Sequence, residues 1–363
     1  MSRFWSLWRL TWRTMLFVSS GCNLVAEPIF AGDAGVDVGI DGEVVNPDAG
    51  PDAAPNPVLT SRLLIADGAG VIAFDRLDQR APFADAVRWD DVTAAVVGSG
   101  VLFLGRPGTA PIAMFDDAGR LEPIRTPTRE LNETEAGGAI DSIEEMRVDE
   151  NGTLWVLLGS GDVRAYFQAA FRLPDESISA APFRDGHLDG FAYDAATDRL
   201  YAGPGDAGQV LVWVNALTRE SLGPSTFAFG GDCRVTAMTI GADLYAACND
   251  GRIAVWEAPQ LQRAGAEPAR TLQPRGRVQD LQLQNGTLMA TGPTGVDLWR
   301  VAGSAEGEPD VHVEVGGERA LRDSSDTLFV LTADDVHVVQ NATSDPTVAG
   351  QLRTERLPLD IAQ

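Results

Sequence analysis

The sequence predicts an all-β protein, a seven-bladed β-propeller of four-stranded blades, on the strength of three observations. First, a leucine, a short apolar run, a glycine- or aspartate-bearing turn and a bulky residue recur seven times. The leucines are Leu63, Leu102, Leu154, Leu200, Leu244, Leu288 and Leu328. Second, their spacings of 39, 52, 46, 44, 44 and 40 residues are close to the length of one propeller blade. Third, the bulky residue always follows 11 to 13 residues later, at Phe74, Phe115, Tyr166, Trp213, Trp256, Trp299 and Val339.

Residues 1–22 have the order of an export signal. Arginines precede a short apolar stretch, and small residues then lead to Cys22. The ending Ser19-Ser20-Gly21-Cys22 resembles the lipobox of bacterial lipoproteins, a family in which the cysteine is lipidated and becomes the first mature residue. The resemblance implies a lipid anchor on Cys22 and a place in the cell envelope, at the outer membrane, in the periplasm or at the cell surface. The alternative is an ordinary cleaved signal with an incidental cysteine.

Residues 23–58 are predicted to be a disordered linker, rich in Gly, Ala, Asp, Pro and Val. Such a composition buries too little apolar surface to offset the conformational entropy of the chain. The aspartates from Asp33 to Asp52 suggest calcium, but most are spaced four apart, whereas calcium loops of the EF type place acidic ligands two apart. We therefore expect a solvated tether.

The propeller is expected to fill residues 59–363, and the fifth copy shows the pattern of its strands. Residues 234–240 alternate as a strand does, 244–248 form a second strand and 253–256 a third, with turns at Gly241-Ala242 and Asn249-Asp250-Gly251. The second strands are almost continuously apolar, as packing between neighbouring blades requires. The bulky residue that ends each third strand is expected to fill space between blades. Candidates for outer strands are 171–173, 225–229 and 269–272.

The chain is predicted to close its own ring. The first copy begins with the second-strand pattern at Arg62, so its inner strand is missing. The final residues, Leu357 to Gln363, resemble the inner-strand stretch from Val278 to Gln284. We expect the C-terminal strand to complete the first blade, which would leave no open sheet edge between the chain ends.

Cys233 and Cys248 are predicted to form a disulfide. They lie at opposite ends of one expected hairpin, and an exported protein meets an oxidising compartment. The alternative is a pair of small buried thiols.

Composition excludes several kinds of chemistry. With 52 acidic and 28 basic residues the formal charge is −24, which argues against nucleic-acid binding. All basic residues are arginines, so a Schiff-base lysine and a phosphate-loop lysine are both excluded. The sequence contains no Ser nucleophile elbow, HExxH or CxxC motif, and its three histidines are isolated.

Few residues stand out as a candidate site. Acidic doublets such as Glu144-Glu145 are not expected to form paired catalytic carboxylates, because neighbours on a strand point to opposite faces. His187 precedes an expected inner strand and so lies on a loop feeding the axial face. The longest insertion, residues 125–142, carries Glu130, Glu133 and Glu135. Since long loops on rigid scaffolds often carry function, these glutamates and His187 are the predicted partner contacts.

The stretch VDENGTLWVLLGSGDVRAY, Val148 to Tyr166, resembles the repeats of bacterial propellers of the NHL, sensor-kinase and lactonase types. The resemblance extends at the level of blades over residues 60–363. It implies a propeller, and in some relatives a metal at the axis and lactonase or lyase activity. WD40 proteins share the repeat length, but their Gly-His and Trp-Asp pairs are missing here.

The predicted function is that of a membrane-anchored, exported binding or scaffolding module for a protein or small-molecule ligand. We expect a monomeric propeller without catalytic residues. The alternatives are a calcium-dependent, lactonase-like hydrolase and a subunit of an envelope complex whose partner covers one face.

Overall fold

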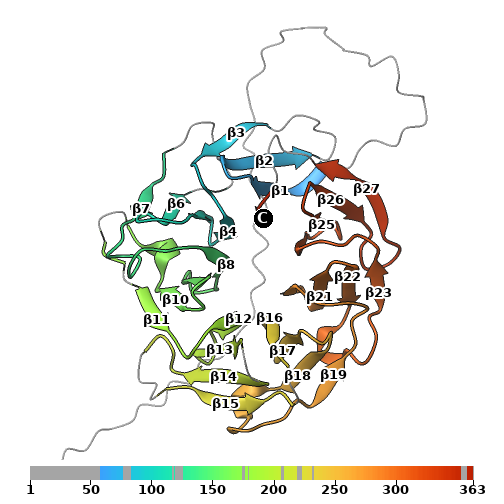
Figure 1. Cartoon of the computed structure of the whole chain (residues 1–363). Coiled ribbons are helices and arrows are strands. Elements are labelled where there is room, and N and C mark those ends of the chain that lie inside the picture. Colours follow the sequence, from blue (N-terminus) through green and yellow to red (C-terminus); the bar gives the residue numbers. More distant parts are fainter. Residues whose placement is uncertain are drawn as a thin grey trace, which may run out of the picture. The chain divides into compact units, whose positions relative to one another are not determined.

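The computed structural model shows seven four-stranded antiparallel sheets arranged as a ring, which confirms the β-propeller (Figure 1). It describes residues 58–76, 83–116, 118, 126–173, 176–178, 180–205, 208–218, 223–230, 233–352 and 358–362. Residues 55–363 form one compact unit. The predicted signal peptide, Cys22 and the linker up to residue 57 lie outside the described residues.

Each blade runs from an inner strand at the axis to an outer strand at the circumference. Blade 1 is β28 (Asp360–Ala362), β1 (Val58–Ala66), β2 (Gly70–Arg76) and β3 (Phe83–Arg88). Blade 2 is β4 (Ala94–Gly98), β5 (Val101–Gly105), β6 (Ile112–Asp116) and β7 (Arg129–Leu131). Blade 3 is β8 (Ile143–Val148), β9 (Leu154–Leu158), β10 (Val163–Tyr166) and β11 (Ala180–Phe183).

The other four blades follow in chain order. Blade 4 is β12 (Leu188–Asp194), β13 (Arg199–Pro204), β14 (Gln209–Val214) and β15 (Ser225–Ala228). Blade 5 is β16 (Val235–Ile240), β17 (Asp243–Cys248), β18 (Ile253–Glu257) and β19 (Arg270–Leu272). Blade 6 is β20 (Asp280–Gln284), β21 (Thr287–Gly292), β22 (Gly295–Trp299) and β23 (Val311–Val313). Blade 7 is β24 (Arg319–Arg322), β25 (Leu328–Leu331), β26 (Val336–Gln340) and β27 (Thr347–Leu352).

The repeated leucine and its bulky partner are direct cross-strand neighbours in all seven blades. Leu244, for example, lies opposite Trp256, and Leu63 lies opposite Phe74. Both members of each pair are buried, in clusters that combine residues of adjacent blades. Side chains directly opposite on one sheet face stabilise the pairing, so this pair fixes the register of the two middle strands in every blade.

The C-terminal strand closes the ring as the sequence predicts. β28 pairs with β1, with Ile361 opposite Ile65 and Ala362 opposite Leu64. Ile361 is 1% exposed and packs among residues of blades 1 and 7. Because the first and last parts of the chain share one sheet, neither end of the ring presents an unpaired inner strand.

The outer strands were only partly predicted. Two candidates are confirmed, in β15 and β19. The third, 171–173, is wrong: its first residue ends a 3-10 turn, η2 (Ala169–Phe171), and the outer strand of blade 3 is β11. The insertion at 125–142 is likewise less irregular than expected, because it contains β7, the outer strand of blade 2.

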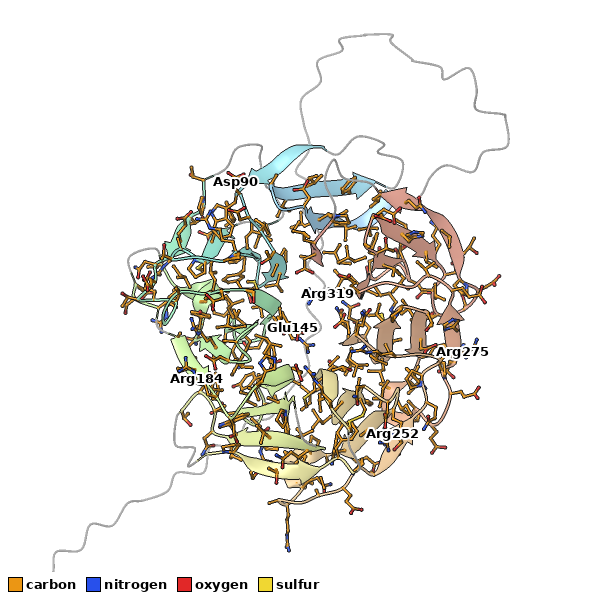
Figure 2. All side chains as sticks on the ribbon, in the orientation of Figure 1. Asp90, Glu145, Arg184, Arg252, Arg275 and Arg319 are labelled. Atoms are coloured by element: carbon orange, nitrogen blue, oxygen red, sulfur yellow. A yellow bond between two sulfur atoms is a disulfide. The ribbon has the colours of Figure 1, made fainter. Side chains whose placement is uncertain are left out.

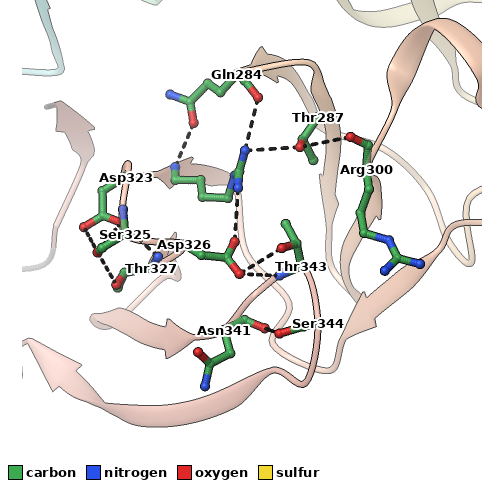
Figure 3. Close-up of polar contacts among 11 residues, drawn as sticks. Gln284, Thr287, Arg300, Asp323, Ser325, Asp326, Thr327, Asn341, Thr343 and Ser344 are labelled. Carbon is green, nitrogen blue, oxygen red and sulfur yellow. Dashed lines mark hydrogen bonds and ion pairs between the residues drawn. The ribbon is translucent and has the colours of Figure 1, made fainter.

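Polar contacts join the ends of the inner strands of blades 6 and 7 (Figure 3). Arg322, on β24, donates through Nη2 to the Gln284 carbonyl at 3.2 Å and to Thr287 Oγ1 at 3.1 Å. Its backbone N–H donates to Gln284 Oε1 at 2.9 Å, and its Nη1 binds Asp326 Oδ1 at 3.1 Å. Asp326 in turn accepts hydrogen bonds from the backbone and hydroxyl of Thr343. One partly buried arginine therefore joins two blades and two turns.

No helix among the described residues is long and apolar enough to span a membrane.

Deleting residues 357–363 should lower the melting temperature sharply, because β1 would lose its inner partner. The matched substitution Ile361→Ala should cost about 3 kcal/mol, as expected for a large-to-small change in a packed core. Leu359→Ala is the control, since that side chain is 45% exposed. Thermal and urea unfolding measure both; an Ile361→Ala variant as stable as the Leu359→Ala variant would contradict the closure.

Candidate functional site at the propeller axis

The register of the inner strands places one residue from each blade at the same level around the axis. In every blade this residue pairs with the third residue after the repeated leucine. We call these seven residues the inner ring. They are Asp360, Ala94, Glu145, Gly190, Ala237, Asp280 and Arg319. Three carboxyl groups and one guanidinium group therefore meet where the other three blades contribute only small residues.

The residues that immediately precede the inner ring form a second circle, which we call the rim. Its members, again one from each blade, are Leu359, Thr93, Glu144, Asp189, Thr236, Gln279 and Glu318. All seven line a cavity of about 250 Å³, together with Glu145, Asp280, Arg319 and Asp360 of the inner ring. The cavity thus collects six carboxyl groups and one arginine from segments spread over the whole chain.

Glu144 and Glu145 both line this cavity, although neighbours on a regular strand point to opposite faces. The reason is a β-bulge: the pairing of β8 with β9 shifts between Ile143 and Glu145, and Glu144 is the extra residue. A bulge bends the strand and redirects a side chain that regular alternation would turn away. The pairings of blades 4 and 5 shift at Asp189 and at Thr236, so three consecutive blades share the feature.

Arg319 is the centre of a buried ion-pair network. Its Nη1 lies 2.5 Å from Asp360 Oδ1, and its Nε lies 4.0 Å from Asp280 Oδ2. Figure 2 shows Arg319 and Glu145 facing the middle of the ring from opposite sides. Glu145 forms its own ion pair with Arg147. The ion pairs of Arg319 thus link blades 1, 6 and 7, and the charge of Glu145 on blade 3 acts on Arg319 across the axis.

Additional hydrogen bonds hold the carboxylates of this network in place. Asp360 Oδ2 accepts from the backbone N–H of Ala95 at 2.8 Å, and Oδ1 accepts from that of Ile361 at 2.9 Å. Asp280 Oδ2 accepts from Gln282 Nε2 at 3.0 Å. The Ala95 bond crosses from blade 1 to blade 2, so Asp360 fastens the closing strand to its neighbour as well as to Arg319.

Burial shifts the protonation equilibria at the axis. Burial raises the pKa of Glu145 and of Asp360, although Arg147 and Arg319 lower the first value and Arg319 lowers the second. Burial alone would lower the pKa of Arg319, but Asp360, Asp280 and Glu145 together raise it, so the guanidinium stays charged. Burial also raises the pKa of Glu144 on the rim.

Beyond the network, toward the end of the ring where the inner strands finish, lies a second cavity of about 340 Å³. Glu145 and Arg319 border both cavities, and the second is otherwise lined by apolar side chains such as Leu283 together with the polar side chains of Arg147, Gln282 and Gln284. The ion-pair network therefore separates an acidic compartment from one of mixed polarity.

A groove of about 380 Å³ adjoins the acidic cavity and shares Asp189, Thr236 and Gln279 with it. Its other polar residues are Arg234, Asn249 and Arg277. Arg234 binds both oxygens of Asp189, with Nε to Oδ2 at 2.7 Å and Nη2 to Oδ1 at 2.8 Å. This fork-to-fork geometry fixes the arginine against the rim.

The predicted cysteine pair lies behind this groove. Cys233 and Cys248 are at disulfide-bonding distance, with Cα atoms 5.5 Å apart. Cys248 pairs in register with Val235, and the bulge at Thr236 accounts for the inexact register of the sequence-based expectation. A bridge closing a loop of this length contributes about 3 kcal/mol. It would also hold the segments that carry Arg234 and Asn249, the residues that follow the two cysteines.

The predicted partner contacts fall into two groups that the structure does not bring together. His187 lies at the axial end, with Nε2 3.4 Å from Asp189 Oδ1 and its side chain 46% exposed. The glutamates of the insertion lie at the circumference. Glu130 accepts a hydrogen bond from Trp89 Nε1, Glu135 binds Arg129 and Asn132, and Glu133 is exposed.

Comparisons with known proteins establish the fold and nothing finer. No family model and no curated protein matches the sequence. A proposed 6-phosphogluconolactonase from Bacteroides uniformis superimposes with a TM-score of 0.60 at 12% identity, over 83% of this chain and 98% of the other. A chain of the mitotic checkpoint complex superimposes with a TM-score of 0.55 at 14% identity, over 90% of this chain and 92% of the other. Raptor from Chaetomium thermophilum superimposes with a TM-score of 0.59 at 14% identity, over 83% of this chain and 27% of the Raptor chain.

An arginine already engages the carboxyl groups of the inner ring. Arg319 already engages Asp360 and lies near Asp280, so calcium would have to displace a guanidinium group from these oxygens. Among the described residues there is no group of three or more His, Cys, Asp or Glu side chains arranged to hold a metal. Glu144 and Glu318, which form no ion pair among the described residues, lie on the rim.

Arg319→Gln should destabilise the protein by about 3 kcal/mol near neutral pH, because it leaves buried carboxyl groups without their cation. Arg275→Gln, at an exposed arginine away from the axis, is the control and should have almost no effect. Urea unfolding of both variants measures the difference.

The loss of stability caused by Arg319→Gln, relative to the unmodified protein, should shrink as the pH falls from about 8 to about 5. Glu145 and Asp360 have raised pKa values in the folded state, so they bind protons more readily there than in the unfolded chain. Their contribution to the free energy of unfolding therefore falls as pH rises through these pKa values. Removing Arg319 raises both pKa values further, which makes the free energy of unfolding of the variant depend more steeply on pH. A deficit that does not change with pH would contradict this account.

Proposed function

We propose that this propeller is a binding module whose axial cavity takes a cationic group, an amine or a guanidinium, of a protein or small-molecule ligand. The supporting observation is the excess of negative charge at the cavity. Three of its six carboxyl groups are matched by an arginine: Glu145 by Arg147, Asp189 by Arg234 and Asp360 by Arg319. Glu144, Asp280 and Glu318 remain in excess.

Glu144 and Glu318 are the best-placed contacts for such a ligand. Both are exposed at the mouth, and they come from blades 3 and 7. Neither accepts a side-chain hydrogen bond from any residue that the structure describes. A cation bound between them would gain charge-assisted hydrogen bonds without breaking an ion pair of the protein. Carboxyl groups at a concave site also concentrate cations from solution and speed their association.

The double variant Glu144→Gln and Glu318→Gln should weaken binding of agmatine, a guanidinium-bearing amine, by at least about fivefold, since losing 1 kcal/mol already costs this much. Binding to the unmodified protein should itself weaken with added salt. Glu133→Gln removes an exposed charge from the insertion and should leave agmatine binding unchanged. Calorimetric titration of the three proteins tests this. Loss of binding in Glu133→Gln alone would move the site to the insertion.

The second candidate is a calcium-dependent, lactonase-like hydrolase, which the similarity to the proposed 6-phosphogluconolactonase favours. The charge of the cavity opposes it for an anionic substrate, because a phosphorylated lactone would face the excess carboxylates. Turnover of lactones that requires calcium, together with a higher melting temperature in calcium, would replace the binding-module proposal with this one.

We also propose that the module is displayed in the cell envelope through a lipid on Cys22. The support is the lipobox-like sequence Ser19-Ser20-Gly21-Cys22 and the linker-like composition of the residues after it. A tether of this length would hold the propeller off the membrane surface and leave its axial face accessible.

The mature chain should begin at Cys22 and carry acyl groups. Mass spectrometry of the protein purified from membranes would show this, and Cys22→Ser should release the protein from the membrane fraction. A mature chain that begins elsewhere, or a Cys22→Ser protein that stays membrane-bound, would rule out the anchor.

A further inference from the structure

The groove beside the acidic cavity has the opposite chemistry from the cavity itself. Arg234, Arg277 and Asn249 line it, whereas the cavity collects carboxyl groups. The two spaces share Asp189, Thr236 and Gln279, so they are contiguous. One small ligand can therefore contact both at once. This inference rests on the proposed function, because it extends the same site.

Arg277 is the free cation of this groove. It is exposed, and no ion pair joins it to any carboxylate of the described residues. Arg234 is already paired with Asp189, which leaves its charge largely neutralised but its position fixed. An anionic group seated here would meet the guanidinium of Arg277 first and could draw further hydrogen bonds from Arg234.

The groove is held in shape before any ligand arrives. The backbone N–H of Asn249 donates to the Arg234 carbonyl at 2.9 Å, and the N–H of Arg234 donates to Asn249 Oδ1 at 3.1 Å. The residues before them, Cys233 and Cys248, are at bonding distance. A site whose walls are already ordered loses less entropy on binding, so weak polar contacts suffice to give specificity.

We infer that the ligand is dipolar, with a cationic group in the axial cavity and a carboxylate in the groove of Arg277, Arg234 and Asn249. A basic residue at the C-terminal end of a peptide has this chemistry. A carboxylate fits better than a phosphate because it carries a single negative charge. A dianionic phosphate at the same place would be repelled more strongly by Asp189, Glu144 and Glu318 on the rim.

Three acetylated tripeptides separate the two halves of the proposal. Acetyl-Ala-Ala-Arg carries only a guanidinium and a carboxylate, its C-terminal amide carries only the guanidinium, and the citrulline analogue carries only the carboxylate. We expect the free acid to bind about tenfold more tightly than the amide, the gain typical of one charge-assisted contact. The citrulline peptide should bind most weakly, because it lacks the group that the cavity takes.

Variants then locate the contact. Arg277→Gln should bind the acid and the amide equally, whereas Arg275→Gln, two residues away and outside the groove, should keep the tenfold preference. Glu318→Gln should weaken both peptides alike. Both arginines are exposed, so neither substitution threatens folding.

The outcomes distinguish failure of the dipolar inference from failure of the proposed cation site. If the unmodified protein binds acid and amide equally, the dipolar inference is overturned and the cation site stands. If Arg275→Gln and Arg277→Gln behave alike, the groove is not the contact. If the citrulline peptide binds as well as the arginine peptide, or if no peptide binds at up to about 10 mM, a limit far above useful affinities, both proposals fall.

Discussion

The structure depends on one largely buried guanidinium group. Arg319 binds Asp360 of blade 1 and lies near Asp280 of blade 6, and Asp360 lies on the strand that closes the ring. Ring closure and axial electrostatics are therefore not independent. Without Arg319, Asp360 would be a buried carboxylate supported only by two backbone N–H groups. Replacing such a network with apolar side chains often costs nothing, whereas removing one partner leaves an uncompensated buried charge, so the network fixes positions more than it adds stability.

The fold could be predicted because its signals are local and repeated. Each marker leucine and its bulky partner lie on neighbouring strands, and the same pairing holds in every blade, so even a degenerate sequence shows it seven times. Closure was visible for a related reason: the first copy lacks an inner strand, and a spare strand-like segment ends the chain. The outer strand of blade 3 was misplaced because outer strands have a weaker apolar pattern, and Phe171 mimics one.

The axial site could not be predicted in the same way. Its rim takes single residues from positions as far apart as Thr93 and Leu359, and no sequence motif joins them. Regular alternation predicts that Glu144 and Glu145 point to opposite faces of the strand. The bulge that brings both side chains to the cavity has no recognisable signature in one sequence. The cluster of axial side chains could be recognised only once the register of the strands was known. His187 was found because it precedes an inner strand, and that argument, applied to every blade, would have pointed to the rim.

The bulges explain how a nearly symmetric ring acquires a one-sided site. A regular propeller presents equivalent positions from all blades to its axis, which favours a ligand on the axis itself. In blades 3, 4 and 5 the extra residue redirects Glu144, Asp189 and Thr236, and Arg234 and Asn249 stand beside them. The other four rim residues immediately precede inner strands whose pairing has no bulge. Opposite charges consequently gather on one side of the mouth, where a ligand with both signs of charge has a single favourable orientation.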